Sequence, residues 1–326
     1  MPGGCPFAAT INLFYDGLSN ALAVTLTAPL ERVIIRHQVS GSSGKDDNNK
    51  KDAATTTNGG STITIPSTVS SLVAIGGGIW SLWKWNSVEI LNITLGNYLS
   101  TNYFQPKFYS ALLLLVDNND NTKKKKDDDD KQLQQQQQRH VVVSRFFGSV
   151  SSFVVLYPLK FAFCTLVVNN DNNSNNNKYD GVQDCLSKSM NDHGMLSIFT
   201  GVTAATVGFM INYISMYYMS TTYAKNKKKE EDDDDGSKRR SSRLQLAIQQ
   251  VIIPTIAKCL AYPFETFSRR QILALDNNTG VDIYSNLYDG NTANILKSVA
   301  ANSVVVLYDS TNMDIMLRRI IMKLFH

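Results

Sequence analysis

Three short motifs place a charged residue two positions after a proline. They read TAPLERVIIRHQ around Pro29, LYPLKFAFCTL around Pro158 and AYPFETFSRRQIL around Pro263. The charged residues that follow these prolines are Glu31, Lys160 and Glu265. A proline inside a helix removes one backbone hydrogen bond and kinks the helix, so three kinked helices can converge at one end of a bundle. Two acids and one base that meet there could form ion pairs. The threefold recurrence predicts a tandem repeat.

The elements that must position these residues are long, moderately apolar segments. We expect helices near residues 11–35, 86–104, 140–167, 201–223, 245–275 and 292–322. Segments of about 20 residues or more can cross a bilayer core of roughly 30 Å as helices. Each also carries polar or charged residues, as expected where one helix face lines a polar interior. A soluble helical bundle is the alternative, because moderately apolar helices suit either solvent.

Polar residues are concentrated in four tracts, at residues 39–62, 117–139, 168–178 and 225–243. Such tracts cannot bury enough apolar surface to offset the entropy of ordering, so we expect solvated loops there. The chain then divides into a first repeat with a polar insertion, a low-complexity loop, a second repeat, another low-complexity loop and a third repeat. The first repeat spans 1–116, with the insertion at 39–62, and the first low-complexity loop spans 117–139. The second repeat spans 140–224, the second loop 225–243 and the third repeat 244–326.

Composition excludes several classes of function. The formal net charge is +4, and the basic runs stand beside acidic runs, which argues against nucleic-acid binding. The cysteines and histidines show neither metal-ligand nor disulfide spacing. The sequence contains no recognisable nucleophile–base pairing and no phosphate-binding glycine loop, so no motif in it indicates an enzyme. The first ten residues resemble neither a secretory signal nor a transit peptide, so we expect internal membrane targeting.

The motifs resemble those of the mitochondrial carrier family and are most like the ADP/ATP carriers. APLERV is similar to the first-repeat motif of that family, YPLKFA to the second and YPFETFSRR to the third. The resemblance extends to GIWSLWKWN at 78–86, the segment at 179–201 and VVVLYD at 304–309. It implies an all-α membrane protein of the mitochondrial inner membrane. Six transmembrane helices, in three tandem two-helix repeats, would surround a central cavity, with short helices on the matrix side.

The resemblance also implies a matrix-side gate, in which the acid after each proline pairs with a base that stands five residues after the next proline. The base positions are held by Ile34, Phe163 and Ser268, and the second acid is replaced by a lysine. Leaving a buried charge unpaired costs roughly 3–5 kcal/mol, so we expect a fixed triad of Glu31, Lys160 and Glu265 instead. Gln38 matches the glutamine that braces this region in the family. The alternative is that each charge is hydrated at a helix end.

The gate at the opposite end has its own motif in the family: an aromatic residue, then an acid, and a base three residues after the acid. Tyr308 and Asp309 match this pair, but Asn312 replaces the base. Residues 103–106 and 218–223 offer no acid. Since alternating access needs two states of similar free energy, each held by its own contacts, the loss of both sets argues against ordinary transport.

The resemblance assigns six substrate-binding candidates in the cavity, for use if transport is retained. They are Arg269, Lys297, Gly208, Phe209, Asn212 and Asn92. Arg269 and Lys297 keep the positive charge of the family's phosphate contacts, and arginine suits phosphate well. Val24 and Asn92 replace two other bases, and Asn212 stands where an aromatic ring is expected. Alternatively, Arg269 and Arg270 are ordinary positive charges at a helix end.

Cardiolipin is the bound lipid that the resemblance implies. Tyr179, Gly181 and Gly201 match cardiolipin-binding elements around the second matrix helix, although glycine near a helix end is also ordinary turn chemistry. Residues 283–295 leave no room for a third matrix helix.

The degenerate gates favour a carrier-fold protein that no longer transports. It would act as an accessory or structural subunit of a larger inner-membrane assembly such as a respiratory-chain complex. The alternative is a working antiporter of adenine nucleotides or another anionic metabolite. In either case we expect a multi-pass inner-membrane protein without enzyme activity, with cardiolipin as a bound lipid, no other cofactor and no nucleic-acid partner.

Overall fold

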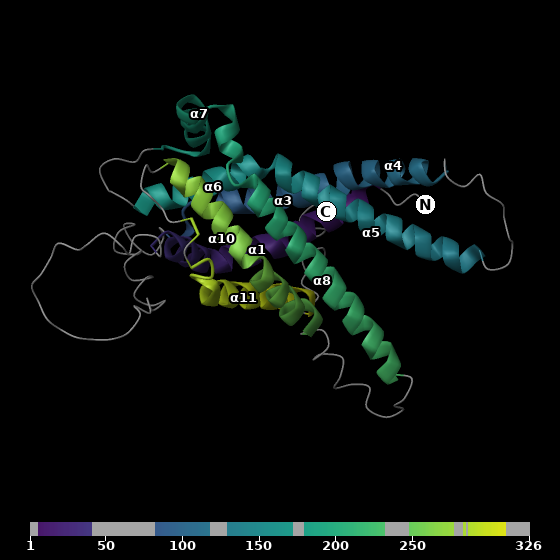
Figure 1. The fold of residues 1–326 in the computed structure, drawn as a ribbon. Helices are drawn as coiled ribbons and strands as arrows, with labels where there is room; N and C mark the ends of the chain where they lie inside the picture. Colours follow the sequence, from purple (N-terminus) through teal and green to yellow (C-terminus); the bar gives the residue numbers. More distant parts are fainter. Residues whose placement is uncertain are drawn as a thin grey trace, which may run out of the picture.

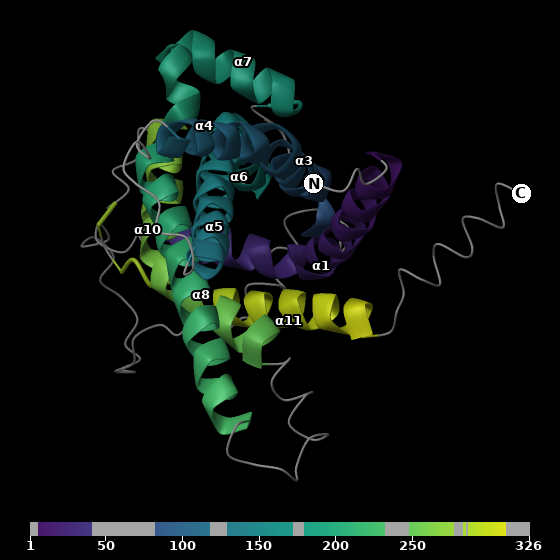
Figure 2. The same ribbon diagram turned by 90° about the vertical axis from the view of Figure 1, so that its right-hand side faces the viewer.

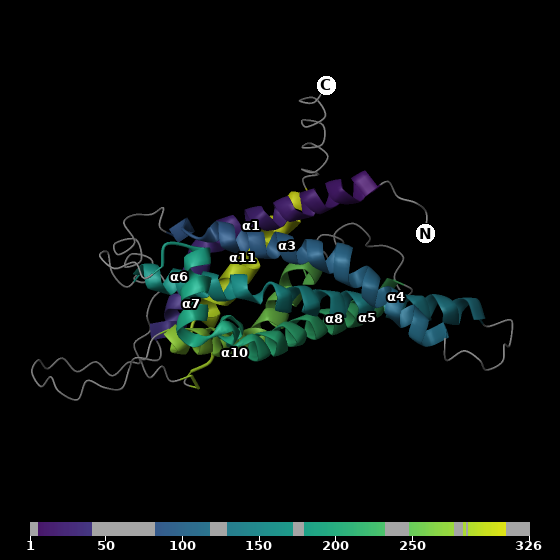
Figure 3. The same ribbon diagram turned by 90° about the horizontal axis from the view of Figure 1, so that it is seen from above.

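The computed structural model describes residues 6–40, 82–117, 129–171, 179–231, 248–276, 283–284 and 286–310. All regular elements in these ranges are helical and none is a strand, which confirms the all-α prediction (Figure 1). The long helices pack against one another at different angles (Figures 1, 2 and 3), and the short helix α7 (Val182–His193) lies beside α6 (Tyr157–Asp171), outside the main group (Figures 1 and 2).

Six helical stretches correspond to the six expected segments. They are α1 (Pro6–Ser40); α3 (Asn86–Tyr98), continued by the π-helical η2 (Leu99–Phe104) and by α4 (Gln105–Asp117); α5 (Asp129–Val155) with α6 (Tyr157–Asp171); α8 (Val202–Glu231); the π-helical η4 (Ile248–Ile252) with α10 (Ile253–Asp276); and α11 (Asn291–Ser310). A short 3-10 helix, η3 (Met195–Phe199), links α7 to α8.

Helices extend into tracts that we predicted to be loops. Residues 129–139 belong to α5, so the loop prediction for 117–139 is wrong there. Glutamine and lysine are good helix formers, and a helix already nucleated by an apolar segment propagates through them at little cost. Residues 118–128 and most of the other polar tracts lie outside the described part of the chain.

The six stretches form a closed ring. α1 packs against α3, the α3–η2–α4 stretch against α5, α5 against α8, α8 against α10, α10 against α11, and α11 against α1 (Figure 2). The three helices that carry the motif prolines, α1, α6 and α10, also contact one another across the ring. The prediction that they converge is therefore confirmed.

The prolines act on their helices in two ways. Pro29 and Pro263 lie inside α1 and α10. Pro158 is the second residue of α6, and the axis bends by 49° between the end of α5 and α6. Because proline lacks the N–H for the helix ladder and clashes with the preceding turn, the break falls just before it. The bend turns α6 toward α1 and α10.

The largest cluster of buried apolar side chains surrounds α6. Tyr157, Phe161 and Val167 are at most 1% exposed and pack with Ile35 from α1 and Ile272 from α10. Burial of such side chains contributes roughly 1.5–3 kcal/mol each. This core fixes the convergence of the three proline helices.

Two tyrosines that directly precede a motif proline make the same kind of contact. The Tyr157 hydroxyl donates to the Thr200 carbonyl oxygen at 2.7 Å, just before α8. The Tyr262 hydroxyl donates to the Asp289 carbonyl oxygen, just before α11. Each tyrosine thus holds its helix to the start of the next long helix. The two contacts are equivalent in kind, and the tandem repeat inferred from the motifs stays a prediction.

The start of α3 is tied to α1 by three hydrogen bonds. The Trp83 Nε1 donates to the Thr25 carbonyl oxygen at 2.7 Å, and Asn86 Nδ2 to the Thr25 hydroxyl at 3.1 Å. Arg32 donates to the Lys84 carbonyl oxygen at 2.9 Å. The tryptophan-rich segment before α3 therefore sets the position of α3 beside α1.

One described helix is long and apolar enough to cross a membrane by itself. It spans Met195–Ala224 with a mean hydropathy of 1.5. The bent pair Gln137–Val155 and Tyr157–Val168 also passes if it is taken as a single span. No other helix among the described residues meets the same requirements of length, hydropathy and charge.

Two glycines give a matched test of the ring's packing. A Cβ on Gly208 of α8 would lie 3.0 Å from the Cβ of Phe264 on α10, whereas one on Gly96 of α3 would meet only Leu156 Cδ1 at 3.5 Å. Alanine gains about 1 kcal/mol over glycine in a helix, but overpacking costs about 1–3 kcal/mol. In detergent melts we expect Gly96→Ala to stabilise the protein and Gly208→Ala to destabilise it. Shifts of Tm in the same direction would contradict the close approach of α8 and α10.

Candidate functional site

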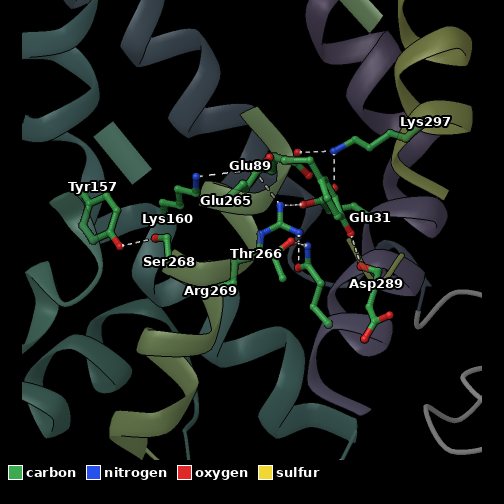
Figure 4. A network of polar contacts seen from close by, with 12 residues as sticks. Glu31, Glu89, Tyr157, Lys160, Glu265, Thr266, Ser268, Arg269, Asp289 and Lys297 are labelled. Atoms are coloured by element: carbon green, nitrogen blue, oxygen red, sulfur yellow. Dashed lines mark hydrogen bonds and ion pairs between the residues drawn. The ribbon is translucent and has the colours of Figure 1, made fainter. Parts of the chain in front are cut away.

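Six charged residues from five helices form one buried ion-pair cluster where α1, α6 and α10 converge (Figure 4). They are Glu31, Glu89, Lys160, Glu265, Arg269 and Lys297, from α1, α3, α6, α10, α10 and α11. Their side chains are between 6% and 36% exposed. For the most buried of them, Glu31 and Arg269 at 6%, leaving the charge without a partner would be costly.

Glu31 is the centre of the acidic side of the ion-pair cluster. One carboxylate oxygen accepts from Arg269 Nη2 and the other from Lys297 Nζ at 2.6 Å. Lys297 Nζ also donates to Glu89 at 3.1 Å. This single carboxylate therefore links α10 and α11 to α1, and Lys297 adds α3.

Arg269 is the centre of the basic side. Besides Glu31, it donates to Glu265 at 3.0 Å and, through Nη1, to Gln38 Oε1 at 3.0 Å. Gln38 in turn donates to the Thr266 hydroxyl at 2.8 Å. A planar guanidinium can hold several acceptors in fixed directions, which a lysine ammonium does less well.

The expected triad is present only in part. Lys160 pairs with Glu265 at 3.7 Å, as predicted. Glu31, however, takes Arg269 and Lys297 as its partners, so the predicted link between Glu31 and Lys160 is wrong. Arg269 lies one helical turn after Glu265, and its guanidinium group donates to the carboxylates of both Glu31 and Glu265. Arg269 and Lys297, which the resemblance assigns to substrate binding, thus complete the ion-pair cluster. Gln38 contacts Arg269 there, as expected.

A cavity of about 400 Å³ opens against the ion-pair cluster. Its walls come from all six helical stretches of the ring: the acids and bases above, amides and hydroxyls, and a group of apolar side chains. The polar lining residues are Asn92, Asn97, Ser100, Ser149, Ser152 and Asn294. The apolar ones include Val88, Ile93, Leu156, Leu159, Phe163 and Phe209.

Four of the six substrate-binding candidates line this cavity. They are Arg269, Lys297, Phe209 and Asn92. The Phe209 ring stacks on Phe153 with the centroids 4.9 Å apart. Gly208 lies against α10 instead, and Asn212 is not part of the described lining. Gly208 therefore serves helix packing.

The lining residues that the sequence analysis did not single out include Glu89, Lys258 and Asn294. Lys258 and Asn294 have unused donors. Lys258 forms no hydrogen bond or ion pair with any described residue. Asn294 is 6% exposed, and its buried Nδ2 has no hydrogen-bond partner in the described part of the chain. A signal for Lys258 was available: it stands seven residues before Glu265, on the same face of an apolar helix.

Arg270 is not an ordinary helix-end charge. It is fully buried, donates through Nε to the Gln38 carbonyl oxygen at 3.1 Å and lies 3.6 Å from the Asp289 carboxylate. Arg269 is likewise paired and 5% exposed. The helix-end interpretation of these two arginines is therefore wrong. Arg270 holds α10 to α1 and to the turn before α11.

The predicted cardiolipin residues lie around α7. Tyr179 is buried beside Cys185, Gly181 precedes α7 and Gly201 precedes α8. Near the start of α7, Lys188 and the Asp180 backbone N–H hydrogen-bond the Asp184 carboxylate and hold its pKa below the usual range.

The other matrix-side and outer-gate predictions are only partly covered. Residues 283–284 and 287–290 form turns and α11 begins at Asn291, but residues 277–282 and 285 lie outside the described part of the chain, so the absence of a third matrix helix stays a prediction. Tyr308 is buried in α11. The Asp309 side chain and Asn312 lie outside the described residues. Val24 is buried in α1 and does not contribute to the described cavity wall.

Comparison with known protein families gives no match: no family model fits this chain. Its function must therefore be inferred from the ring, the ion-pair cluster and the cavity.

Proposed function

We propose that this chain is a multi-pass protein of the mitochondrial inner membrane with the mitochondrial carrier fold, and that it carries a small anionic solute. The observation that supports this most directly is the central cavity, closed at one end by the ion-pair cluster. A cavity inside a ring of helices, with a closure of breakable ion pairs, is what alternating access requires.

The arrangement of the ring supports the proposal of six membrane spans, although few of its helices are strongly apolar. Most of the placed charges on these helices line the cavity: Glu31 of α1, Glu89 of α3, Lys258, Glu265 and Arg269 of α10, and Lys297 of α11. Large apolar side chains remain exposed on the outside of these helices, including Leu26, Leu91, Ile256, Leu260 and Leu307. Polar residues inside and apolar residues outside suit a bundle in lipid.

The ion-pair cluster changes the balance between the two functions considered from the sequence. The absence of the family's gate contacts from the sequence favours the accessory role. Arg269, Lys297 and Glu89 provide a different closure at the matrix end, so the missing bases there no longer argue against transport. The charge of the cavity lining favours an anionic solute, since the lining contains four basic and three acidic side chains.

The second candidate is the accessory subunit of a respiratory-chain assembly. One observation favours it: among ion pairs between described residues, none lies at the opposite end of the ring, around 103–106 and 218–223. A protein held by one closure would keep one conformation, as a structural subunit does.

A cavity-filling variant and a matched neighbour distinguish these functions. The full chain is reconstituted in cardiolipin-containing liposomes, and uptake of labelled lactate, glutarate, phosphate and ADP is measured. Asn92→Trp fills the cavity and is expected to abolish uptake. Leu91→Trp, at a position 53% exposed on the outside of the same helix, is expected to retain it.

Correct insertion of both variants is checked by protease protection before uptake is compared. No uptake of any solute by folded, inserted protein would overturn the transport proposal and favour the accessory role. Uptake by Asn92→Trp equal to that of Leu91→Trp would show that solute does not pass through this cavity.

A further inference from the structure

The charges around the cavity do not match a multiply charged solute. Of the described lining residues, three are acids, Glu31, Glu89 and Glu265, and four are bases, Lys160, Lys258, Arg269 and Lys297. Arg269, Lys297 and Lys160 are each within 4 Å of a carboxylate. One positive charge is left over, and it belongs to Lys258.

We propose that the cavity binds an organic monoanion, a small monocarboxylate, with Lys258 as its charge contact and Asn294 as an amide donor. This inference rests on the proposed function and names the class of its solute. One carboxylate neutralises the uncompensated charge of the lining without breaking any ion pair. A nucleotide or tricarboxylate would bring two or more further negative charges into a site that also holds three carboxylates, and uncompensated charge is costly away from water.

The positions of the two donors support a shared ligand group. Lys258 lies on the cavity face of α10 together with Glu265 and Arg269, at spacings of seven and eleven residues, which bring side chains to one side of a helix. Asn294 stands one turn before Lys297 on α11, the helix that packs against α10. A carboxylate has two oxygens and can accept from an ammonium and an amide at once. The unused Nδ2 of Asn294 would gain its missing partner.

The remaining wall suits a small apolar body. Val88, Ile93, Leu159 and the rings of Phe163 and Phe209 line the cavity beside its polar residues. A volume of about 400 Å³ lies at the small end of the range for ligand sites. Carbon skeletons of a few atoms fit such a space, with the carboxylate directed to Lys258.

The test varies charge on one carbon skeleton. Binding of butyrate, glutarate and tricarballylate, which carry one, two and three carboxylates on propane, is measured by thermal stabilisation of the purified full chain at equal ionic strength. Butyramide is the uncharged control. We expect butyrate to bind most tightly, glutarate more weakly and butyramide not at all. Lys258→Met should weaken butyrate binding roughly 10- to 100-fold, the loss of one charge-assisted contact.

Matched variants separate this contact from general effects. Lys258→Arg should keep butyrate binding, and Lys188→Met, which removes an exposed lysine on α7, should leave it unchanged. If Lys258→Met does not fold, Asn294→Ala replaces it and should weaken butyrate binding several-fold. Unchanged butyrate affinity in the folded Lys258→Met protein would overturn the assignment of Lys258.

The outcomes also separate this inference from the proposed function. Tighter binding of glutarate, tricarballylate or ADP than of butyrate would overturn the monoanion, while anion carriage would stand. Uptake of ADP that Asn92→Trp abolishes, with no butyrate binding, would lead to the same conclusion. No stabilisation by any anion, together with no uptake, would overturn both.

Discussion

Glu31→Gln is expected to lower the free energy of unfolding by about 3–5 kcal/mol, the usual cost of leaving a buried charge without its partner. Glu31 is 5% exposed and accepts from both Arg269 and Lys297, so its loss leaves two cations with fewer partners. The glutamine keeps the size of the side chain, removes its charge and replaces one of the two acceptor oxygens by an NH2 donor. Thermal and chemical unfolding of the purified protein in detergent gives the measurement.

A double-mutant cycle shows whether the effect comes from the ion pair. Arg269→Met alone leaves Glu265 paired with Lys160. Combined with Glu31→Gln, it should cost clearly less than the sum of the single changes, since the pair is then removed as a unit. Asp184→Asn, at an exposed pair on α7, should hardly change the stability. A loss below about 1 kcal/mol for Glu31→Gln would contradict a buried, paired carboxylate.

Gly201→Ala is expected to cost about 2–5 kcal/mol, from a left-handed backbone and a clash together. Gly201 has φ of 82°, and a Cβ there would lie 2.7 Å from the Ser268 carbonyl oxygen and 3.0 Å from the Tyr157 hydroxyl. That hydroxyl holds the start of α8 through its bond to Thr200. The methyl group would therefore push apart α6, α8 and α10 at one point.

Gly194→Ala is the control for backbone strain. Gly194 has φ of 86°, but no atom lies within 4 Å of its added Cβ. Its substitution should cost only the conformational part, about 1–2 kcal/mol. The difference between the two variants in thermal unfolding isolates the steric contact with Ser268. Equal losses would show that α8 and α10 are farther apart than the structure has them.

Ser268 shows why the sequence was informative about the fold and less so about the site. Ser268 stands where the resemblance places a gate base. In the structure it is fully buried, and its hydroxyl is 3.1 Å from that of Tyr157, in a space that a lysine or arginine would not fit. The compensating base, Arg269, is its neighbour in the chain. Moving a charge by one residue turns it by about 100° around the helix, so the pairing must be rebuilt in three dimensions.

The helical stretches and the proline motifs could be predicted because their signals are local, whereas the arrangement of the helices around a cavity was implied only by the resemblance to the mitochondrial carriers. Apolar stretches, motif prolines and turns each act within a few residues, and the structure keeps all six stretches. The partners of Glu31 depend instead on which faces of α10 and α11 turn inward, and those helices follow it by more than 200 residues. Glu89 and Lys258 were missed for the same reason. Six membrane spans and the family itself remain proposals.

The closure of the ring by α1 and α11 has a consequence for biosynthesis. Glu31 is made near the beginning of the chain, but the residues that neutralise it follow 238 and 266 residues later. During synthesis its carboxylate must therefore be protonated, hydrated or held by another protein until α10 and α11 emerge. Contacts so distant in sequence form slowly. Translation of α11 thus completes the described wall of the cavity and supplies Lys297, which neutralises a carboxylate made with α1.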